Sequence, residues 1–256
     1  MARNFKAILS YDGSPYSGWQ IQPGRTTIQG KLAGVIKNIT GEQVLPQGSG
    51  RTDTGVHALG QVASFSLESP IPVANLHTAL NDKLPESIRV MTLEEVPPEF
   101  HARHSSKSKT YLYRIYREAI CPPFLADFVS HVSWPLDEAG MIRAASIVTG
   151  EHDFTSFTAT DPEKTARDNK ERFPVNDNVR TIYSSTWERR GEELVYIVRG
   201  NGFLHHMVRN LVGTFLLVGK ETYSPADVER ILAAKNRSQA GPTAAANGLY
   251  LVKVEY

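Results

Sequence analysis

The spacing of apolar and polar residues predicts strands and helices in both halves of the chain. Residues 5–11 and 110–116 alternate with a period of two, which is typical of a strand that buries one face. In residues 26–39 the apolar positions Ile28, Leu32, Val35, Ile36 and Ile39 share one side of a helix. The same patterns predict strands at 61–67, 88–96, 179–189, 192–199 and 249–256, and helices at 73–84, 137–148, 203–218 and 225–234.

This order of elements predicts an α+β fold. We expect two similar ferredoxin-like-type halves, residues 1–105 and 106–256, with a central, mainly antiparallel sheet and helices on one face. The other face of the sheet would be left for partners. Residues 161–180 carry five acidic and five basic residues without a convincing period, and are expected to form a mobile surface loop.

Cysteine usage indicates the cellular compartment of the protein, whereas its net charge does not indicate a class of partner. The 28 Lys and Arg residues nearly balance the 27 Asp and Glu residues, so the net charge of +1 neither favours nor excludes a polyanionic partner. Cys121 is the one cysteine and no leader-like apolar segment opens the sequence, which together predict a cytoplasmic protein. The most apolar segment, 211–218, is far shorter than the roughly 20 residues that span a bilayer, so no membrane segment is expected.

The strongest chemical signal is the segment 48–57, Gly-Ser-Gly-Arg-Thr-Asp-Thr-Gly-Val-His. Its glycines allow a close approach of the backbone, so the loop can expose Asp53 to a substrate. Arg51, two residues away, would favour the ionised carboxylate that a nucleophile or base requires. The alternative is an ordinary Asx-type turn with a surface salt bridge. The chain has no Walker loop and no G-x-G-x-x-G, so a phosphate cradle is not predicted.

A second signal lies in residues 100–117, which contain no acidic residue. Cations alternate there with aromatic rings: Arg103, Lys107, Lys109, Arg114 and Arg117 with Tyr111, Tyr113 and Tyr116. Such a strand can hold phosphates and offer rings on which bases stack, which makes Lys107, Lys109 and Arg114 candidates for RNA binding. The alternative is a half-buried strand with core tyrosines and solvated cations.

A third segment, 200–210, opens an apolar helix that carries Arg209 in its first turns. Arg209 is either a solvated residue at the boundary of the helix or the partner of a carboxylate from elsewhere in the chain. The residues alone favour the boundary residue. Two histidine pairs, His101 with His104 and His205 with His206, lack H-E-x-x-H or cysteine partners, so no metal site is predicted.

The motifs of the chain resemble those of the TruA-type tRNA pseudouridine synthases along nearly its whole length. They are Tyr11-Asp12-Gly13, Gly18-Trp19-Gln20, Gly50-Arg51-Thr52-Asp53-Thr54-Gly55-Val56-His57-Ala58, Phe100-His101-Ala102-Arg103, Lys109-x-Tyr111-x-Tyr113, Gly150-x-His152-Asp153-Phe154, Met207-Val208-Arg209-Asn210-Leu211-Val212-Gly213 and Gly248-Leu249-Tyr250-Leu251, in the family's order. Two features depart from the family: Ala245 stands where a proline is usual, and the loop 161–180 is longer.

The resemblance implies a homodimer that converts uridine to pseudouridine in the anticodon stem-loop of tRNA, at positions 38, 39 and 40. Neither a metal nor a small-molecule cofactor is implied. By resemblance, Asp53 is the catalytic aspartate, Tyr111 stacks on the uracil and assists proton transfer, Arg209 pairs with the aspartate, and Arg51 helps to flip or steady the nucleotide.

Two other classes of protein remain open at this point. A non-catalytic RNA-binding protein would use the same basic and aromatic strand, but would not need an aspartate flanked by arginine. A metal-dependent phosphodiesterase could use Asp53 and the histidines, and would lose activity to chelators.

Overall fold

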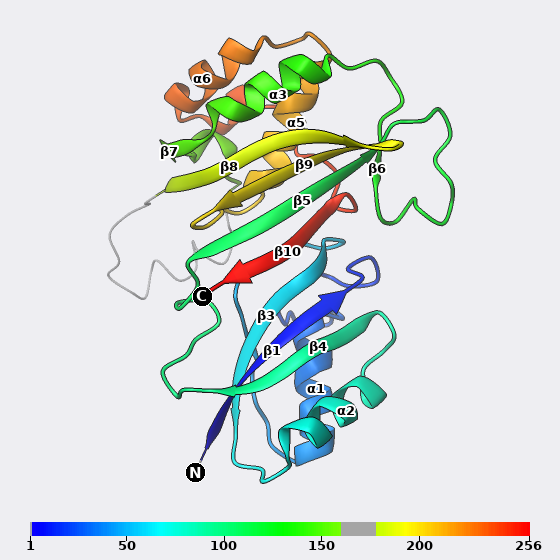
Figure 1. Cartoon of the computed structure of the whole chain (residues 1–256), viewed down its shortest axis with the longest axis vertical. Coiled ribbons are helices and arrows are strands. Elements are labelled where there is room, and N and C mark those ends of the chain that lie inside the picture. The colour runs from blue at the N-terminus through cyan, green and yellow to red at the C-terminus, as the bar shows by residue number, and fades with distance from the viewer. Residues whose placement is uncertain (1, 160–177) are drawn as a thin grey trace. The chain divides into compact units, whose positions relative to one another are not determined.

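The computed structural model describes residues 2–159 and 178–256. Most of the charged segment 161–180 therefore lies outside the described residues. The chain forms two compact units, one of Met1–Thr110 with Ala246–Tyr256 and one of Tyr111–Ala245 (Figure 1). The predicted division after residue 105 differs from this grouping in one main respect: the last strand belongs with the N-terminal residues.

The first unit is a mainly antiparallel sheet with two helices. Its strands are β1 (Arg3–Tyr11), β2 (Gln47–Gly48), β3 (His57–Leu67), β4 (Ile88–Val96) and β10 (Leu249–Glu255), and its helices are α1 (Ile28–Thr40) and α2 (Val73–Lys83). The strand order is β4-β1-β3-β10, with β2 beside β3. β10 alone among these runs parallel to its neighbour, with Tyr250 opposite His57 and Leu251 opposite Ala58. Helices α1 and α2 contact each other, and α2 contacts β4, so both cover the same face.

Local sequence explains these elements. Every second residue of β1, from Phe5 to Tyr11, is buried, which places one face of the strand against the helices. Helix α1 begins after Thr27, whose side chain accepts a hydrogen bond from the N–H of Gly30. It ends at Gly41, which has a φ of 78° and takes the left-handed conformation that favours glycine.

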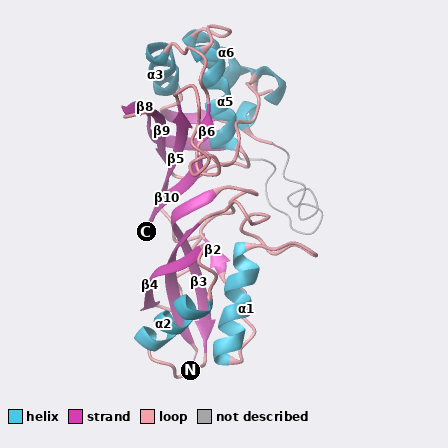
Figure 2. Cartoon of the chain, turned by 90° about the vertical axis from the view of Figure 1, so that its right-hand side faces the viewer, coloured by secondary structure: helices cyan, strands magenta, loops and turns pink. Residues whose placement is uncertain are grey.

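The second unit repeats this plan. Its strands are β5 (Ser108–Tyr116, which starts at the end of the first unit), β6 (Ser130–His131), β7 (Gly150–Asp153), β8 (Val179–Arg190) and β9 (Glu193–Gly200). Its helices are α3 (Glu138–Ile147), α5 (Met207–Gly219) and α6 (Pro225–Ala234), with short 3₁₀ turns at Thr155–Phe157 and Arg237–Gln239. The strand order is β5-β9-β8-β7. Helix α3 contacts α5, α6 and β8, so these helices share one face of the sheet, as Figure 2 shows from the side.

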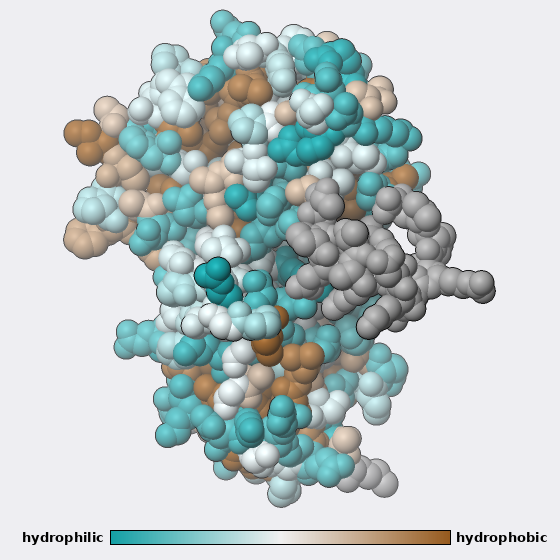
Figure 3. All heavy atoms as spheres, turned by 180° about the vertical axis from the view of Figure 1, so that it is seen from behind, coloured by the Kyte–Doolittle hydropathy of each residue, from teal (hydrophilic) through white to brown (hydrophobic). Residues whose placement is uncertain are grey.

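Aromatic residues fill the core between this sheet and its helices. The Trp187 ring lies 5.0 Å from Tyr196 and 6.3 Å from Phe215, and all three residues are buried. Hydrophilic residues cover much of the described surface seen in Figure 3, with smaller apolar areas among them. This distribution is that of a folded domain with a core in each half.

The predicted fold class is confirmed: two α+β halves, each with a mainly antiparallel sheet and helices on one face. Among the described helices, none is long and apolar enough to cross a membrane. The largest shifts in a boundary are of four residues: β3 starts at His57 rather than at residue 61, and α5 starts at Met207 rather than at residue 203.

Candidate active site

Asp53 lies on a loop that connects β2 to β3. Gly48 at one end of the loop pairs with Ala63, and His57 at the other end opens β3. The loop turns at Asp53, whose carbonyl accepts a hydrogen bond of 3.1 Å from the N–H of Val56. Arg51 is exposed and Asp53 is half-buried, whereas Thr52 between them is buried. The loop therefore anchors itself through Thr52 and presents the arginine and the aspartate on its outer side.

The segment 13–19 also holds this loop, through backbone contacts. The N–H of Trp19 donates to the carbonyl of Thr52 over 3.0 Å, and the N–H of Gly55 donates to the carbonyl of Tyr16 over 3.4 Å. At Gly18, with a φ of +81°, a Cβ atom would meet the Thr52 carbonyl oxygen at 2.5 Å. A glycine is thus required where the two segments touch, and this explains the glycine of the Gly-Trp-Gln motif.

Two buried polar side chains, Tyr11 and Gln61, lie on the inner side of the loop. The sequence alone assigns neither of them a role in the site. One signal was available, because Gln61 places an amide within an otherwise largely apolar strand. Buried amides in such positions are hydrogen-bonded, and their partners are residues that they hold in place.

Lysine 109 also contacts the Asp53 loop. The Nζ atom of Lys109 donates a hydrogen bond of 2.7 Å to the carbonyl of Ser49, and it lies near Gly50. Lys107, two residues earlier, is exposed, and its backbone N–H donates to the carbonyl of Glu255. The predicted contacts of both lysines with RNA stay predictions, and for Lys109 the structure adds a role in holding the loop.

In the second unit, the two tyrosines of β5 have different surroundings. Tyr113 is fully buried and its hydroxyl donates to the carbonyl of Ala245 over 2.9 Å. Burial raises the pKa of Tyr113 to about 12. Tyr111 is 8% exposed and meets the ring of Phe203 edge-on at 5.0 Å. Tyr113 is therefore a core residue, and Tyr111 remains the candidate for contact with a base.

Arg209 lies in the first turn of α5 and is held by the segment that precedes β10. Its Nε donates to the carbonyl of Ala244 over 2.8 Å, and its own carbonyl accepts from the N–H of Ala244 over 3.1 Å. The first bond restricts the direction of the guanidinium, and the second holds the backbone of Arg209 against the same residue. Asp53 belongs to the first unit and Arg209 to the second, and their ion pair stays a prediction.

The residue after Arg209 anchors the same segment from inside. Asn210 is fully buried, and its Nδ2 donates to the carbonyl of Phe157 over 2.8 Å. Its Oδ1 accepts from the hydroxyl of Thr243 over 2.7 Å and from Arg237 over 3.0 Å. The Arg-Asn pair of the motif thus combines a half-buried cation with a buried amide that secures its support.

Two cations of the basic strand are already engaged within the second unit. Arg114 forms a two-pronged ion pair with Glu193, at 2.7 Å through Nε and 2.5 Å through Nη2. Arg117 donates to the carbonyl of Trp134 over 3.0 Å. RNA binding by Arg114 stays a prediction. It requires a phosphate either to displace the carboxylate of Glu193 or to share the guanidinium of Arg114 with it.

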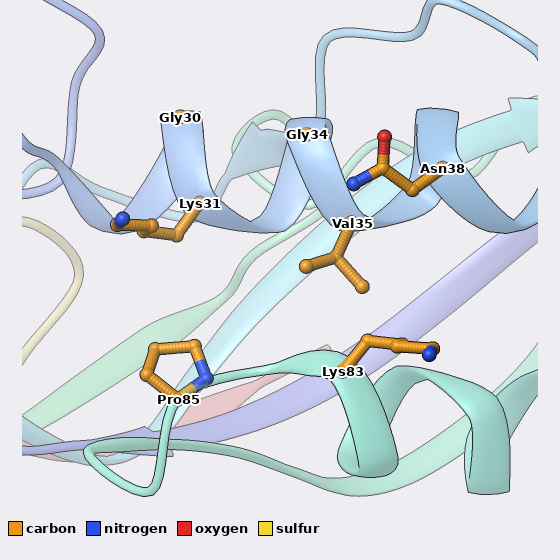
Figure 4. A pocket seen from close by; sticks show the side chains of 7 residues that line it. All are labelled: Gly30, Lys31, Gly34, Val35, Asn38, Lys83 and Pro85. Carbon is orange, nitrogen blue, oxygen red and sulfur yellow. The ribbon is translucent and has the colours of Figure 1, made fainter.

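A pocket of about 410 Å³ lies elsewhere in the first unit, between α1 and the end of α2. Figure 4 shows the residues that line it, Gly30, Lys31, Gly34, Val35, Asn38, Lys83 and Pro85. Its lining offers the amines of Lys31 and Lys83 but no carboxylate, thiol or imidazole. The Asp53 loop is therefore the better candidate for the chemistry.

Comparisons with known proteins identify the family to which the chain belongs. The family model described as tRNA pseudouridine synthase matches residues 7–105 and 144–256. A "tRNA pseudouridine synthase A" of Solibacter usitatus is 48% identical over 254 residues, which are 99% of this chain and 100% of the relative. Relatives of the same name are 42% identical in Brevibacillus brevis, over 99% of this chain and 100% of the relative, and 44% identical in Halalkalibacterium halodurans, over 94% and 88%. The chain belongs to the tRNA pseudouridine synthases, a family of isomerases.

Proposed function

We propose that the protein converts uridine to pseudouridine in the anticodon stem-loop of tRNA, at positions 38, 39 and 40, with Asp53 as the catalytic residue. It does so as a homodimer in the cytoplasm. Membership of the family supports isomerisation of uridine in tRNA. The choice of the anticodon arm rests on the resemblance of the motifs described above.

The observation that carries the proposal is the setting of Asp53. It is the one acidic residue between Glu42 and Glu68, and its loop is fixed both by backbone contacts and by buried polar side chains. A half-buried carboxylate on a rigid loop can reach a substrate without losing its own orientation. The neighbouring Arg51 is exposed, so it can meet the nucleotide on the same side.

The reaction needs a base that has left its stack. The bond between N1 and C1′ breaks, the uracil turns, C5 bonds to C1′, and the proton from C5 is exchanged for one at N1, so substrate and product are isomers. Asp53 attacks C1′ or C6, or removes the proton at C2′. In each case the carboxylate is required, whereas binding of the RNA is not expected to depend on it.

Release of tritium from 5-tritiated uridine in tRNA tests the proposal directly. The wild type should release tritium in the presence of a chelator, and Asp53→Asn should release none while it binds tRNA with nearly unchanged affinity. Glu94→Gln is the matched control, because it makes the same chemical change at a carboxylate that is 55% exposed and paired with Lys6. Measurable turnover by Asp53→Asn would refute the assignment.

The same assay separates the other two classes of protein. Binding without tritium release would indicate a non-catalytic RNA-binding module, and cleavage that stops on addition of chelator would indicate a metal-dependent phosphodiesterase. Substrates labelled at one uridine only, at position 38, 39 or 40, test the proposed location within the tRNA. A label elsewhere that is released as fast would contradict it.

The homodimer is supported by the size of the substrate. A tRNA is comparable in mass to this 28.4 kDa chain, which has a net charge of only +1, so one chain offers few local basic surfaces. Two copies related by a two-fold axis would double them. Light scattering should give a dimer, and a fully active monomer at nanomolar concentration would contradict it.

A further inference from the structure

The inner side of the Asp53 loop is held by a buried network of polar side chains. Gln61 on β3 is fully buried, as is Ser49, and Tyr11 and Thr52 are 4% and 6% exposed. A buried polar group is costly unless it is hydrogen-bonded, so such a cluster persists only if its bonds are satisfied.

Every hydrogen-bonding position of the Gln61 amide is used. Its Oε1 accepts from the hydroxyl of Ser49 over 2.7 Å and from the N–H of Val62 over 3.1 Å. Its Nε2 donates to the carbonyl of Gly50 over 2.8 Å and to the hydroxyl of Tyr11 over 3.5 Å. An N–H can only donate and a carbonyl can only accept, so the backbone of Val62 and Gly50 fixes which way the amide points.

Tyr11 extends the network to the residue that precedes Asp53. Its hydroxyl lies 2.8 Å from Oγ1 of Thr52. Burial raises the pKa of Tyr11 to about 12, so the hydroxyl stays protonated at neutral pH and can donate. Gln61 donates to the Tyr11 oxygen, so the Tyr11 hydroxyl keeps its own proton available for Oγ1 of Thr52.

The two side chains come from neighbouring strands, and an irregularity in their pairing brings them together. Leu9 of β1 lies opposite Gln61, but Tyr11 lies opposite Ala58, so β3 contains one residue more than β1 over this stretch. Such a bulge changes the direction of the side chains beside it. Tyr11 and Gln61 thereby meet under the loop, each on a strand that the sheet keeps rigid.

We propose that Gln61 and Tyr11 are positioning residues that hold the Asp53 loop in its reactive conformation through Ser49, Gly50 and Thr52, without touching the RNA. This inference rests on the proposed function, in which Asp53 is the catalytic residue. A residue of this kind affects the rate of the chemical step and leaves the binding of substrate unchanged, since it lies beneath the loop.

Tyr11→Phe tests the inference, because it removes one hydroxyl and keeps the ring in the core. Tyr196→Phe in the second unit is the matched control: Tyr196 is fully buried, and its hydroxyl lies 2.8 Å from Oγ of Ser185. Each variant loses one bond of 2.8 Å between a buried tyrosine and a hydroxyl, and Tyr11→Phe also loses the longer contact of 3.5 Å from Gln61. Both melting temperatures should therefore fall, that of Tyr11→Phe by the same amount or slightly more. Under conditions where both are fully folded, kcat should fall by roughly 10- to 100-fold in Tyr11→Phe alone, with KM for tRNA unchanged.

Changes at Thr52 separate positioning from general loss of stability. Thr52→Val has nearly the same shape without the hydroxyl and should match Tyr11→Phe, whereas Thr52→Ser keeps the hydroxyl and should retain kcat. The double variant Tyr11→Phe/Thr52→Val should be no slower than either single variant, because both remove the same bond.

The outcomes distinguish this inference from the proposed function. If Asp53→Asn is inactive and Tyr11→Phe has the kcat of the wild type, the positioning role is wrong and the proposed function stands. An equal loss of kcat in Tyr196→Phe, or a rise in KM instead of a fall in kcat, also overturns it. If the wild type releases no tritium, or Asp53→Asn releases it, the proposed function fails and the inference fails with it.

Discussion

Replacement of Gly213 by alanine should loosen the support of Arg209. Gly213 lies inside α5, where a Cβ atom would overlap the carbonyl oxygen of Pro242. That oxygen would have to move by about 1 Å or more to reach 3.0 Å, below which real Cβ contacts are essentially never seen. The backbone that must move continues into Ala244, which forms both hydrogen bonds that hold Arg209.

The size of the effect follows from three contributions. Alanine is favoured over glycine inside a helix by about 1 kcal/mol. Against this, the displaced segment weakens the bond from Ala244 N–H to the Arg209 carbonyl and the bond from Gly241 N–H to the hydroxyl of Thr214, each worth about 1 kcal/mol. The overlap itself adds about 1 kcal/mol or more. The free energy of unfolding should therefore fall by about 2 kcal/mol.

Gly34→Ala is the matched control, because Gly34 is also inside a helix. A Cβ at Gly34 would have no atom within 4 Å, so the variant gains the helical preference of alanine and loses nothing. The unfolding free energy should rise by about 1 kcal/mol, which gives the two substitutions opposite signs.

Urea unfolding and thermal melting of both variants measure this difference, and tritium release reports on Arg209. The melting temperature should fall by roughly 4–8 °C in Gly213→Ala and rise by roughly 2–4 °C in Gly34→Ala. Turnover should fall in the former only. Equal stabilities of the two variants, or a stable Gly213→Ala with normal turnover, would refute the argument that Pro242 and Ala244 are fixed by contact with α5.

Three further predictions concern the proposed site. Tyr111→Phe should lower turnover, measured by tritium release, while tRNA affinity hardly changes. Tyr113→Phe should instead lower the free energy of unfolding, measured in urea, by about 1 kcal/mol, because it loses the bond to the carbonyl of Ala245. Equal losses of turnover in the two variants would contradict a special role for Tyr111. Arg209→Ala should lower turnover far more than Arg189→Ala, which breaks an ion pair with Glu138 whose arginine side chain is 44% exposed. Similar turnover rates in the two variants would indicate that Arg209 is only a boundary residue of the helix. Lys107→Ala should reduce the salt dependence of tRNA binding by about one phosphate contact, and an unchanged slope in a binding titration would remove Lys107 from the interface.

Elements with strong local signals could be predicted from the sequence almost residue by residue. β4 has the predicted bounds, Ile88–Val96, and so does α6, Pro225–Ala234, which begins with a proline and with the reciprocal cap of Ser224 and Asp227. α5 was predicted to start at residue 203, because the apolar period already holds there. The chain does not become helical until Met207, since His206 has a φ of 60°, outside the helical region.

The site could be predicted only in part, because its support depends on residues far apart in the sequence. Asp53 and Arg209 stand in short motifs, so the sequence points to them directly. Gln61 supports the loop by reaching Ser49 and Tyr11, 12 and 50 residues away, and no local pattern shows such contacts. Short strands such as β2 and β6 were also missed, since two residues carry no period.

Because β10 joins the first unit from the far end of the chain, that unit cannot complete its sheet early in synthesis. At about 5–20 residues per second, the last strand follows the N-terminal strands by an interval on the order of 10 s. Until then, β3 has an open edge at His57 and Ala58, and the His57 ring lacks Tyr250, on which it stacks at 4.7 Å. The residues of the second unit are all synthesised within this interval, so the first unit completes its sheet only after the whole second unit has been synthesised. His57, at the end of the Asp53 loop, gains its stacking partner only then.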